Sequence, residues 1–356
     1  MKKLFSIIFT LILMASACNL PSDVDIDDED KEIGVNEIKH PTSAALESCL
    51  DNPGEVKSKW DLWIGCTRLR GVDLHPCNTA DHEVCTVPIT RQDIQDLRDL
   101  GANLVNASYP GVFSVEPPYE IDPYALAHLD NLVSWAEEIG VYIVIHYRTG
   151  PGRNESAIHM DQDAIYDVWM DQAAHNAFIK MWRFTAERYR NSAVVVGYDL
   201  IVEPLVNTIV DPDFEMNSAE YRETVEGTLM DWNAFAKEIT AAIREVDPDT
   251  PIIVSSLSWS DPEWFAVLEP TGDTHTVYSF HAYEPGEYTH QEEDDITYSY
   301  PDVIQGDEEK VNFDRDWLEE YLQPVVNFSV TYDVPIYVGE FGAMRWVPNA
   351  EIFLRD

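Results

Sequence analysis

The chain is poor in basic residues. Its 356 residues include 23 lysines and arginines against 65 aspartates and glutamates, so the formal net charge is −42. A surface of this sign repels phosphate backbones and anionic lipid headgroups, and we therefore expect no nucleic-acid partner. Charge governs solubility and partners rather than fold, and the hydrophobic fraction of 45% is enough to bury a sizeable core.

Long hydrophobic runs are also missing, apart from one short stretch at the N-terminus. Lys2 and Lys3 precede an apolar segment at 4–14, and small residues up to Ala17 lead to Cys18. This pattern is typical of an export signal, and the segment is too short for a mature membrane helix. It resembles a bacterial lipoprotein signal, which predicts a signal peptide at 1–17 and membrane attachment through a lipid on Cys18. Ordinary cleavage near Ala17, giving a secreted protein without an anchor, is the alternative.

Cysteines are few, and all lie in the N-terminal part of the chain. Apart from Cys18 there are Cys49, Cys66, Cys77 and Cys85, and four cysteines allow three disulfide pairings. Export permits disulfides, so we expect these residues to staple the start of the folded domain. A zinc site is the competing interpretation, but the sequence has no C-x-x-C pair and no H-x-x-x-H helix to support it, and we expect no metal.

Several catalytic signatures are absent as well. There is no G-x-S-x-G elbow, no phosphate-binding loop and no dinucleotide fingerprint. These absences argue against a serine hydrolase of the α/β type, a nucleotide-dependent enzyme and a dinucleotide-dependent oxidoreductase. We expect no cofactor.

The chain divides into three parts by composition. Residues 18–55 are acidic with few large apolar side chains, which predicts a flexible tether between the export signal and a single folded domain at 56–356. Within that domain, short apolar runs alternate with amphipathic segments, as in a parallel sheet with helices between its strands. We expect about seven strands, near 69–75, 102–108, 141–146, 194–203, 251–257, 276–283 and 334–340.

Polar side chains stand where several of these strands end. They are His146, Glu203, His281, Tyr283 and Glu340. In a (β/α)₈ barrel the C-terminal ends of the strands meet at one mouth, where catalytic groups lie. Burying carboxylates there is costly unless they are used, and two carboxylates at one barrel mouth suit the cleavage of glycosidic bonds.

The same stretches resemble glycoside hydrolase family 5 or a close relative in its clan. The resemblance extends from about residue 60 to the end of the chain. It is most specific in residues 197–204 (GYDLIVEP), 278–283 (YSFHAY) and 335–342 (PIYVGEFG). It implies a (β/α)₈ barrel with Glu203 as general acid/base and Glu340 as nucleophile. It also implies that His146, His281 and Tyr283 orient the substrate and tune the two glutamates.

The sequence departs from the family pattern in three places. Val202 stands where the family has an asparagine that bonds the sugar 2-hydroxyl, and Asn106 stands where it has an arginine supporting the nucleophile. One hypothesis is that Val202 forms an apolar wall for a sugar without a free 2-hydroxyl. After the seventh strand only residues 346–356 remain, so we expect a barrel that lacks strand 8 and helix 8 and keeps two open edges.

Further side chains are expected around the mouth. Trp259 and Tyr109 follow strands on the catalytic face, where aromatic rings can stack on sugars. The acidic loop at 284–311 is either a wall of the cleft or a solvated insertion. For Arg148 and Arg153 we expect structural ion pairs rather than binding of an anionic substrate.

These observations lead to one main hypothesis and two alternatives. The main hypothesis is a monomeric retaining glycoside hydrolase with a carbohydrate substrate of the β-glucan or β-mannan type, acting within chains rather than at their ends. Its mechanism requires the two carboxyl groups to lie roughly 5–5.5 Å apart. The alternatives are a surface lipoprotein that binds glycans on a degenerate barrel without cutting them, and a transglycosylase.

Overall fold

The computed structural model describes residues 56–75, 89–213, 215–305 and 310–356. The expected signal peptide, the tether and Cys18, Cys49, Cys77 and Cys85 lie outside these residues. Cys66 is described and is disulfide-bonded, in line with the expected staples. Within the described ranges, no helix is both long and apolar enough to cross a membrane.

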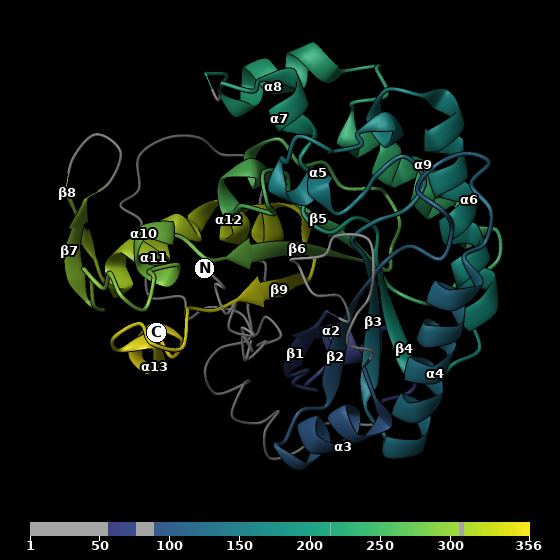
Figure 1. The fold of residues 1–356 in the computed structure, drawn as a ribbon, viewed down its shortest axis with the longest axis horizontal. Coiled ribbons are helices and arrows are strands. Elements are labelled where there is room, and N and C mark those ends of the chain that lie inside the picture. Colours follow the sequence, from purple (N-terminus) through teal and green to yellow (C-terminus); the bar gives the residue numbers. More distant parts are fainter. Residues whose placement is uncertain (1–55, 76–88, 214, 306–309) are drawn as a thin grey trace, which may run out of the picture.

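A sheet of seven parallel strands forms the body of the molecule (Figure 1). The strands curve into a nearly closed barrel in which each strand pairs with the next along the chain, and β1 and β9 stand at the two open edges. All seven strands expected from the sequence are confirmed, with small differences in their bounds. They are β1 (Gly71–Leu74), β2 (Leu104–Tyr109), β3 (Tyr142–Tyr147), β4 (Val195–Asp199), β5 (Ile252–Ser255), β6 (Thr276–Ala282) and β9 (Ile336–Phe341).

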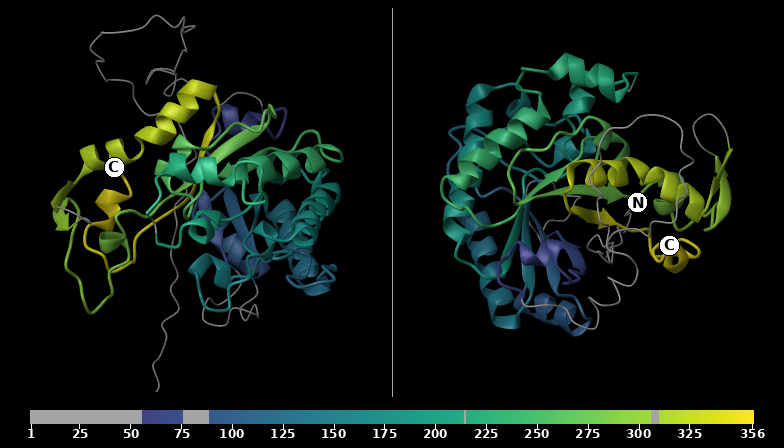
Figure 2. Two further views of the ribbon diagram at one scale, coloured as in Figure 1. Left: turned by 90° about the horizontal axis from the view of Figure 1, so that it is seen from above. Right: turned by 180° about the vertical axis from the view of Figure 1, so that it is seen from behind.

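Helices lie between the strands and cover the outside of the sheet (Figures 1 and 2). The main covering helices are α3 (Arg91–Asp99), α4 (Pro123–Ile139), α6 (Gln172–Tyr189), α9 (Trp232–Arg244) and α12 (Gln323–Tyr332). Shorter helical turns occur in the loops: α5 (Ser156–His159), η1 (Asp167–Trp169), α7 (Val206–Val210), α8 (Ser218–Val225) and η2 (Pro262–Ala266).

The capping residues expected from the sequence are found at the ends of helices α3 and α4. Thr90 and Asp93 form a reciprocal capping box at the start of α3. Asp122 accepts hydrogen bonds from the first turn of α4, and Gly140 ends that helix with a left-handed φ of 80°. These local signals fix where each helix begins and ends, so they also fix which loop reaches the barrel mouth.

Two separate cores hold the barrel together. The larger lies between the sheet and the outer helices. The smaller fills the barrel interior with one apolar side chain from most strands, and α2 (Asp61–Ile64) closes its N-terminal end. There Trp63 packs edge-on against Tyr337 and donates its indole N–H to the Val196 carbonyl at 2.8 Å. The barrel is therefore a packed core at this end and leaves only the opposite end for a site.

A lobe projects from one side of the barrel (Figures 1 and 2). Its core contains side chains that precede β9 in the chain, namely Tyr288, Tyr300, Ile304 and Phe313. Val347 and Phe353, which follow β9, pack against them. The residues after β9 thus enter the lobe, and the described chain adds no eighth strand to the barrel, as expected. The lobe comprises α10 (Gly286–Thr289), the antiparallel hairpin β7 (Asp302–Gln305) and β8 (Lys310–Phe313), α11 (Arg315–Tyr321) and α13 (Ala350–Phe353).

Candidate active site

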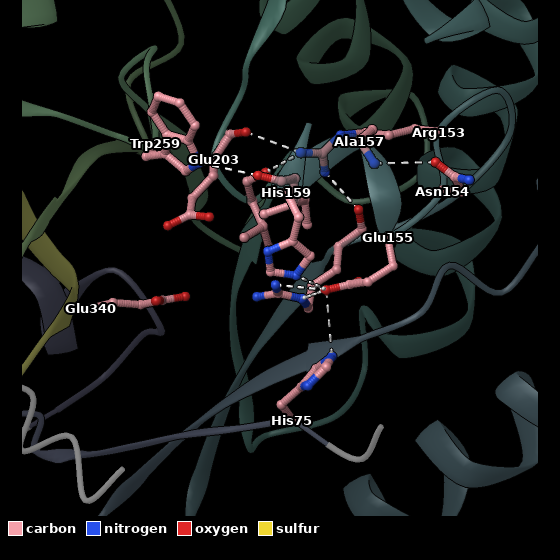
Figure 3. A network of polar contacts seen from close by, with 12 residues as sticks. His75, Arg153, Asn154, Glu155, Ala157, His159, Glu203, Trp259 and Glu340 are labelled. Atoms are coloured by element: carbon pink, nitrogen blue, oxygen red, sulfur yellow. Dashed lines mark hydrogen bonds and ion pairs between the residues drawn. The ribbon is translucent and has the colours of Figure 1, made fainter. Parts of the chain in front are cut away.

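A cleft of about 1120 Å³ opens at the C-terminal ends of the strands. Two carboxylates, Glu203 and Glu340, lie in its floor. His281, Tyr283 and Trp259 also line it, so five of the nine site residues expected from the sequence meet in one place. Figure 3 shows Glu203 and Glu340 directing their carboxylates into the same space from separate strand ends.

Glu203 follows β4 and is held in an unusual backbone conformation. Its φ is 48°, in the left-handed region that non-glycine residues rarely adopt. Arg153 stabilises this turn, because its guanidinium donates to the carbonyls of Val202 and Glu203 at 2.7 and 3.0 Å (Figure 3). The role of Arg153 is therefore structural, but the ion pair expected for it is not found among the described residues, because its guanidinium donates to backbone carbonyls instead. Backbone strain held by buried contacts is a recurrent feature of functional sites.

Glu340 lies on β9 and is kept in its charged form by its neighbours. The Tyr283 hydroxyl donates to Glu340 Oε2 at 3.0 Å, and His281 Nδ1 is 3.7 Å from the same oxygen. Burial alone would raise the pKa of Glu340. The positive charges of His281 and Arg148, together with the tyrosine hydrogen bond, outweigh burial and lower this pKa below its usual value.

His281 lies between the two carboxylates. Its Nδ1 donates to Glu203 Oε1 at 3.0 Å. Burial disfavours the charged ring, but Glu340 and Glu203 outweigh it and raise the pKa of His281. The strand beside it leaves little room, since a Cβ on Gly339 would come within 2.9 Å of His281 Nε2. The glycine thus lets the imidazole lie against β9 and reach both glutamates.

The carboxylates of Glu203 and Glu340 are close enough to act on one bond. One oxygen of each and a ring nitrogen of His281 all lie within 4.8 Å of one another. The same spacing would suit a shared cation, but the raised pKa of His281 favours a doubly protonated ring, which has no lone pair to give a metal. The arrangement is better suited to moving protons and attacking carbon than to holding an ion.

Arg148 reaches the cleft from the end of β3 and is paired within its own loop. It donates to Glu155 Oε1 from two nitrogens, at 2.8 and 2.7 Å. The same oxygen is 3.7 Å from His159 and 4.0 Å from His75, so one buried carboxylate gathers three basic side chains (Figure 3). Burial and the charge of Arg148 lower the pKa of His75 to about 4, so that ring is neutral near pH 7. The ion pair expected for Arg148 is confirmed.

The model of the cellulase family, glycosyl hydrolase family 5, matches residues 67–351. The chain belongs to glycosyl hydrolase family 5.

Its relatives agree with this assignment. Endoglucanase C of Acetivibrio thermocellus is 24% identical over 282 residues, which cover 72% of this chain and 75% of that protein. Cellodextrinase A of Ruminococcus flavefaciens is 27% identical over 183 residues, covering 50% and 47%. As a member of this family the chain is a glycoside hydrolase.

Solved structures support the fold. A hyperthermophilic endo-β-1,4-glucanase in complex with substrate has a TM-score of 0.58 at 18% identity, with 82% of each chain covered. Cel5A of Thermotoga maritima in complex with cellobiose has a TM-score of 0.56 at 19% identity, covering 78% of this chain and 80% of that one. The nearly closed barrel is therefore a family 5 barrel with seven strands described.

Three expected site residues lie beneath the cleft instead of facing it. Asn106, His146 and Val202 are fully buried and none of them lines the cleft. The Asn106 amide is 2.7 Å from His146 Nδ1, and Asp199 Oδ2 is 3.3 Å from the same atom. The expectation of direct substrate contact is wrong for these residues, and the apolar wall proposed for Val202 does not exist in this fold. Asn106, His146 and Asp199 form a buried polar layer beneath the cleft, where the His146 and His281 rings lie 6.3 Å apart.

The two aromatic expectations have different outcomes. Trp259 lines the cleft with 37% of its surface exposed, and its indole N–H donates to the Ile158 carbonyl at 3.1 Å. It lies in a run of three left-handed residues, Ser258, Trp259 and Ser260. Tyr109 is only 1% exposed and packs in the outer core, so the expectation that it stacks on a sugar is wrong.

The lobe forms one wall of the cleft. Ile304 and Val311 from its hairpin and Trp317 and Tyr321 from α11 line the cleft together with the catalytic-face loops. The Tyr321 hydroxyl donates to Asp261 Oδ2, at 2.9 Å, and so joins the lobe to the loop after β5. The structure therefore supports the interpretation of the acidic loop at 284–311 as a wall of the cleft and not as a solvated insertion.

Among the residues that sequence reasoning missed are two acids beside the catalytic glutamates and the histidines. Asp73 on β1 hydrogen-bonds to Glu340, and Asp199 on β4 is buried next to His146. A signal for Asp73 was present, because it stands near the end of a strand as the predicted site residues do. Asp199 had no such signal, since it precedes Glu203 by four residues within an apolar run.

Proposed function

We propose that the enzyme hydrolyses the β-glycosidic bonds of a neutral glucan, within the chain, by double displacement with net retention. The observation that carries this proposal is the approach of the Glu203 and Glu340 carboxylate oxygens to within 4.8 Å. Retaining glycosidases hold their carboxyl groups about 5–5.5 Å apart, whereas inverting enzymes leave about 6.5–9.5 Å for a water molecule. The short separation favours direct attack by a carboxylate.

The two glutamates have different roles because their surroundings differ. Glu340, stabilised as an anion by His281 and Tyr283, attacks the anomeric carbon while Glu203 protonates the departing oxygen. The glycosidic C–O bond breaks and a glycosyl–Glu340 ester forms. Glu203, now ionised, takes a proton from water, which attacks the same carbon and releases Glu340 as a carboxylate. His281 lies 3.0 Å from Glu203 and 3.7 Å from Glu340, so its positive charge can stabilise whichever carboxylate is ionised at each step.

The cleft favours an uncharged substrate. Arg148 lines the cleft, but its charge is already paired with Glu155, and the remaining lining includes Asp211, Glu263 and Glu284. Sugars that carry carboxylates would meet this acidic lining without a free arginine to bind them. Trp259 offers an aromatic surface near Glu203, as sugar rings require.

The cleft is large enough for an extended glycan. Its volume of about 1120 Å³ exceeds the ~300–1,000 Å³ typical of small-molecule pockets. The names of the relatives point to glucan, and one structure of Thermotoga maritima Cel5A holds mannotriose, so β-mannan is the second substrate to test. Export through the signal at 1–17, with or without a lipid on Cys18, would bring the enzyme to such polymers.

Catalytic variants provide the first test. Wild type, Glu340→Gln and Glu203→Gln are compared on β-1,4-glucan, β-1,4-mannan and 2,4-dinitrophenyl β-cellobioside, with melting curves for all three. We expect Glu340→Gln to remain folded and lose ~10⁴-fold or more of its activity on every substrate. Glu203→Gln should still release dinitrophenol in a burst, because this leaving group needs no proton, and added azide should restore turnover and give a β-glycosyl azide.

The same experiment separates the alternatives. Proton NMR of the first product should show the β anomer before mutarotation, and an α anomer would exclude retention. A folded wild type that binds glucan but releases nothing would favour the non-catalytic binding protein. Transfer of the glycosyl group to an added acceptor sugar, in preference to water, would favour the transglycosylase.

A further inference from the structure

Asp73 and Glu340 belong to the two edge strands of the barrel. Asp73 lies on β1 and Glu340 on β9, which do not pair with each other in the described sheet. Their side chains nevertheless hydrogen-bond to one another. The contact spans the opening between the edges and places a second carboxyl group directly against the proposed nucleophile.

A hydrogen bond between two carboxyl groups requires a proton on one of them, because ionised carboxylates only accept. Asp73 Oδ1 and Glu340 Oε1 are both buried, and no N–H or hydroxyl among the described residues donates to either oxygen. A shared proton supplies the missing donor. Without it, two anions would face one another through buried oxygens, which is strongly unfavourable.

The surrounding groups decide which carboxyl holds the proton. Glu340 receives the Tyr283 hydrogen bond and lies 3.7 Å from His281, so its negative charge is well stabilised. Burial, then the charge of Glu340, raise the pKa of Asp73 well above its usual value; Glu203 acts in the same direction and Arg148 opposes it. Burial raises the pKa of Tyr283 and of Tyr337, and nearby carboxylates add to both shifts, so each phenol stays neutral beside Asp73. The proton therefore belongs on Asp73.

We propose that Asp73 is a positioning residue that stays protonated and donates its hydrogen bond to the Glu340 carboxylate. This inference rests on the proposed role of Glu340 as nucleophile. A neutral donor on β1 would orient the carboxylate where the family pattern has a strand-2 arginine and this chain has Asn106. The proton stays on Asp73 throughout the reaction, so the step adds no new bond to the mechanism.

A pH profile on 2,4-dinitrophenyl β-cellobioside tests this role. This leaving group departs without a proton, so kcat/KM for the first step does not depend on Glu203 as acid. In the wild type we expect kcat/KM to fall at high pH as Asp73 ionises and sets a second negative charge beside Glu340. Asp73→Asn keeps an N–H donor that cannot ionise, so its profile should lack this fall while its plateau stays within about tenfold of wild type. Asp73→Ala should be lower than Asp73→Asn by at least ~10-fold at every pH, since it has no donor.

The outcomes distinguish this inference from the proposed function. If Asp73→Asn shows the same high-pH fall as the wild type, or if Asp73→Ala equals Asp73→Asn, the inference is wrong while the hydrolase stands. If the wild type is folded and inactive, or if Glu340→Gln keeps its activity, the proposed function itself fails.

Infrared spectroscopy gives a second readout that needs no activity. At neutral pH the difference spectrum between the wild type and Asp73→Asn should show the C=O stretch of one buried protonated carboxylic acid, because the band of Asp199, which is protonated as well, is common to both proteins and cancels. In Glu340→Gln the anionic neighbour is gone, so the Asp73 band should disappear at a lower pH than in the wild type. A neutral-pH spectrum identical in wild type and Asp73→Asn would overturn the inference.

Discussion

Asp199 is a buried acid whose protonation couples the site to stability. It lies on β4, fully buried, with its oxygens near His146 Nδ1 and the Ser255 hydroxyl. Burial raises the pKa of Asp199 to about 8, although the positive charge of His281 opposes this shift. In the unfolded chain the same group should have a pKa of about 3.9. The folded state therefore keeps a proton between about pH 4 and 8 that the unfolded state has lost.

The sign of this difference predicts a loss of stability as pH rises. The Asp199 contribution is fully present below pH 4 and is lost on the way to pH 8, at up to about 1.4 kcal/mol per pH unit. Asp199→Asn imitates the neutral acid and should flatten the dependence of unfolding free energy on pH by about that slope. Urea unfolding of both proteins at pH 5, 6 and 7 measures it. If the unfolding free energy changes with pH at the same rate in wild type and variant, Asp199 is ionised in the folded state.

At the same scale, the depth of a side chain along its strand explains which site residues the sequence could predict. Glu203, His281, Tyr283 and Glu340 stand at strand ends and reach the cleft as predicted. His146 also stands near a strand end, but it is fully buried below the cleft, whereas Arg148, two residues later, reaches the cleft. Residues two apart along a strand point to the same face at successive depths, so an error of two positions moves a side chain to another layer.

At the scale of elements, the strands were predictable and the lobe was not. The barrel strands are nearly continuous apolar runs, which is the signature of strands buried on both faces. The hairpin of β7 and β8 has only short alternating patterns, with Ile304 and Phe313 buried between exposed neighbours in acidic surroundings. Its apolar partners Val347 and Phe353 come from beyond β9, and such distant pairing leaves no local pattern.

The lobe wall predicts an effect that depends on substrate length. Trp317 and Tyr321 stack at 5.2 Å with an interplanar angle of 16° and line the cleft. We expect Trp317→Ala to raise KM for long β-glucan oligosaccharides about tenfold or more, because the loss of one aromatic contact is worth roughly 1–3 kcal/mol. Cleavage of 2,4-dinitrophenyl β-cellobioside should change much less. Tyr332→Ala is a matched control, since Tyr332 lies on α12 and is not part of the cleft.

Kinetics on a ladder of oligosaccharides measures this effect. Equal losses on short and long substrates would mean that Trp317 only supports the fold. A melting curve for each variant shows whether the lobe core, which Trp317 contacts through Phe313, has been weakened.

At the scale of the whole molecule, the net charge of −42 predicts a marked response to salt. Like charges repel most in the compact state, and raising the ionic strength from about 0.1 to 1 M shortens the screening length from ~10 to ~3 Å. The melting temperature should therefore rise by several degrees between 0.05 and about 1 M sodium chloride. Differential scanning calorimetry measures the shift, and tetramethylammonium chloride should give a similar rise if screening is the cause. A melting temperature that falls with salt would show that attractive ion pairs dominate instead.

The lobe also has a consequence for the order in which the molecule matures. Its core joins residues near 288–313 with residues near 347–353, and Glu340 lies just before the second group. A chain synthesised from its N-terminus can complete the first six barrel strands, with Glu203 and His281, well before β9 and the residues that follow it exist. The nucleophile and the last apolar partners of the lobe core, Val347 and Phe353, are then added within a few residues of each other. A nascent chain is thus catalytically silent until the stretch that carries Glu340 has emerged, so the enzyme becomes reactive in the same step in which the lobe core is completed.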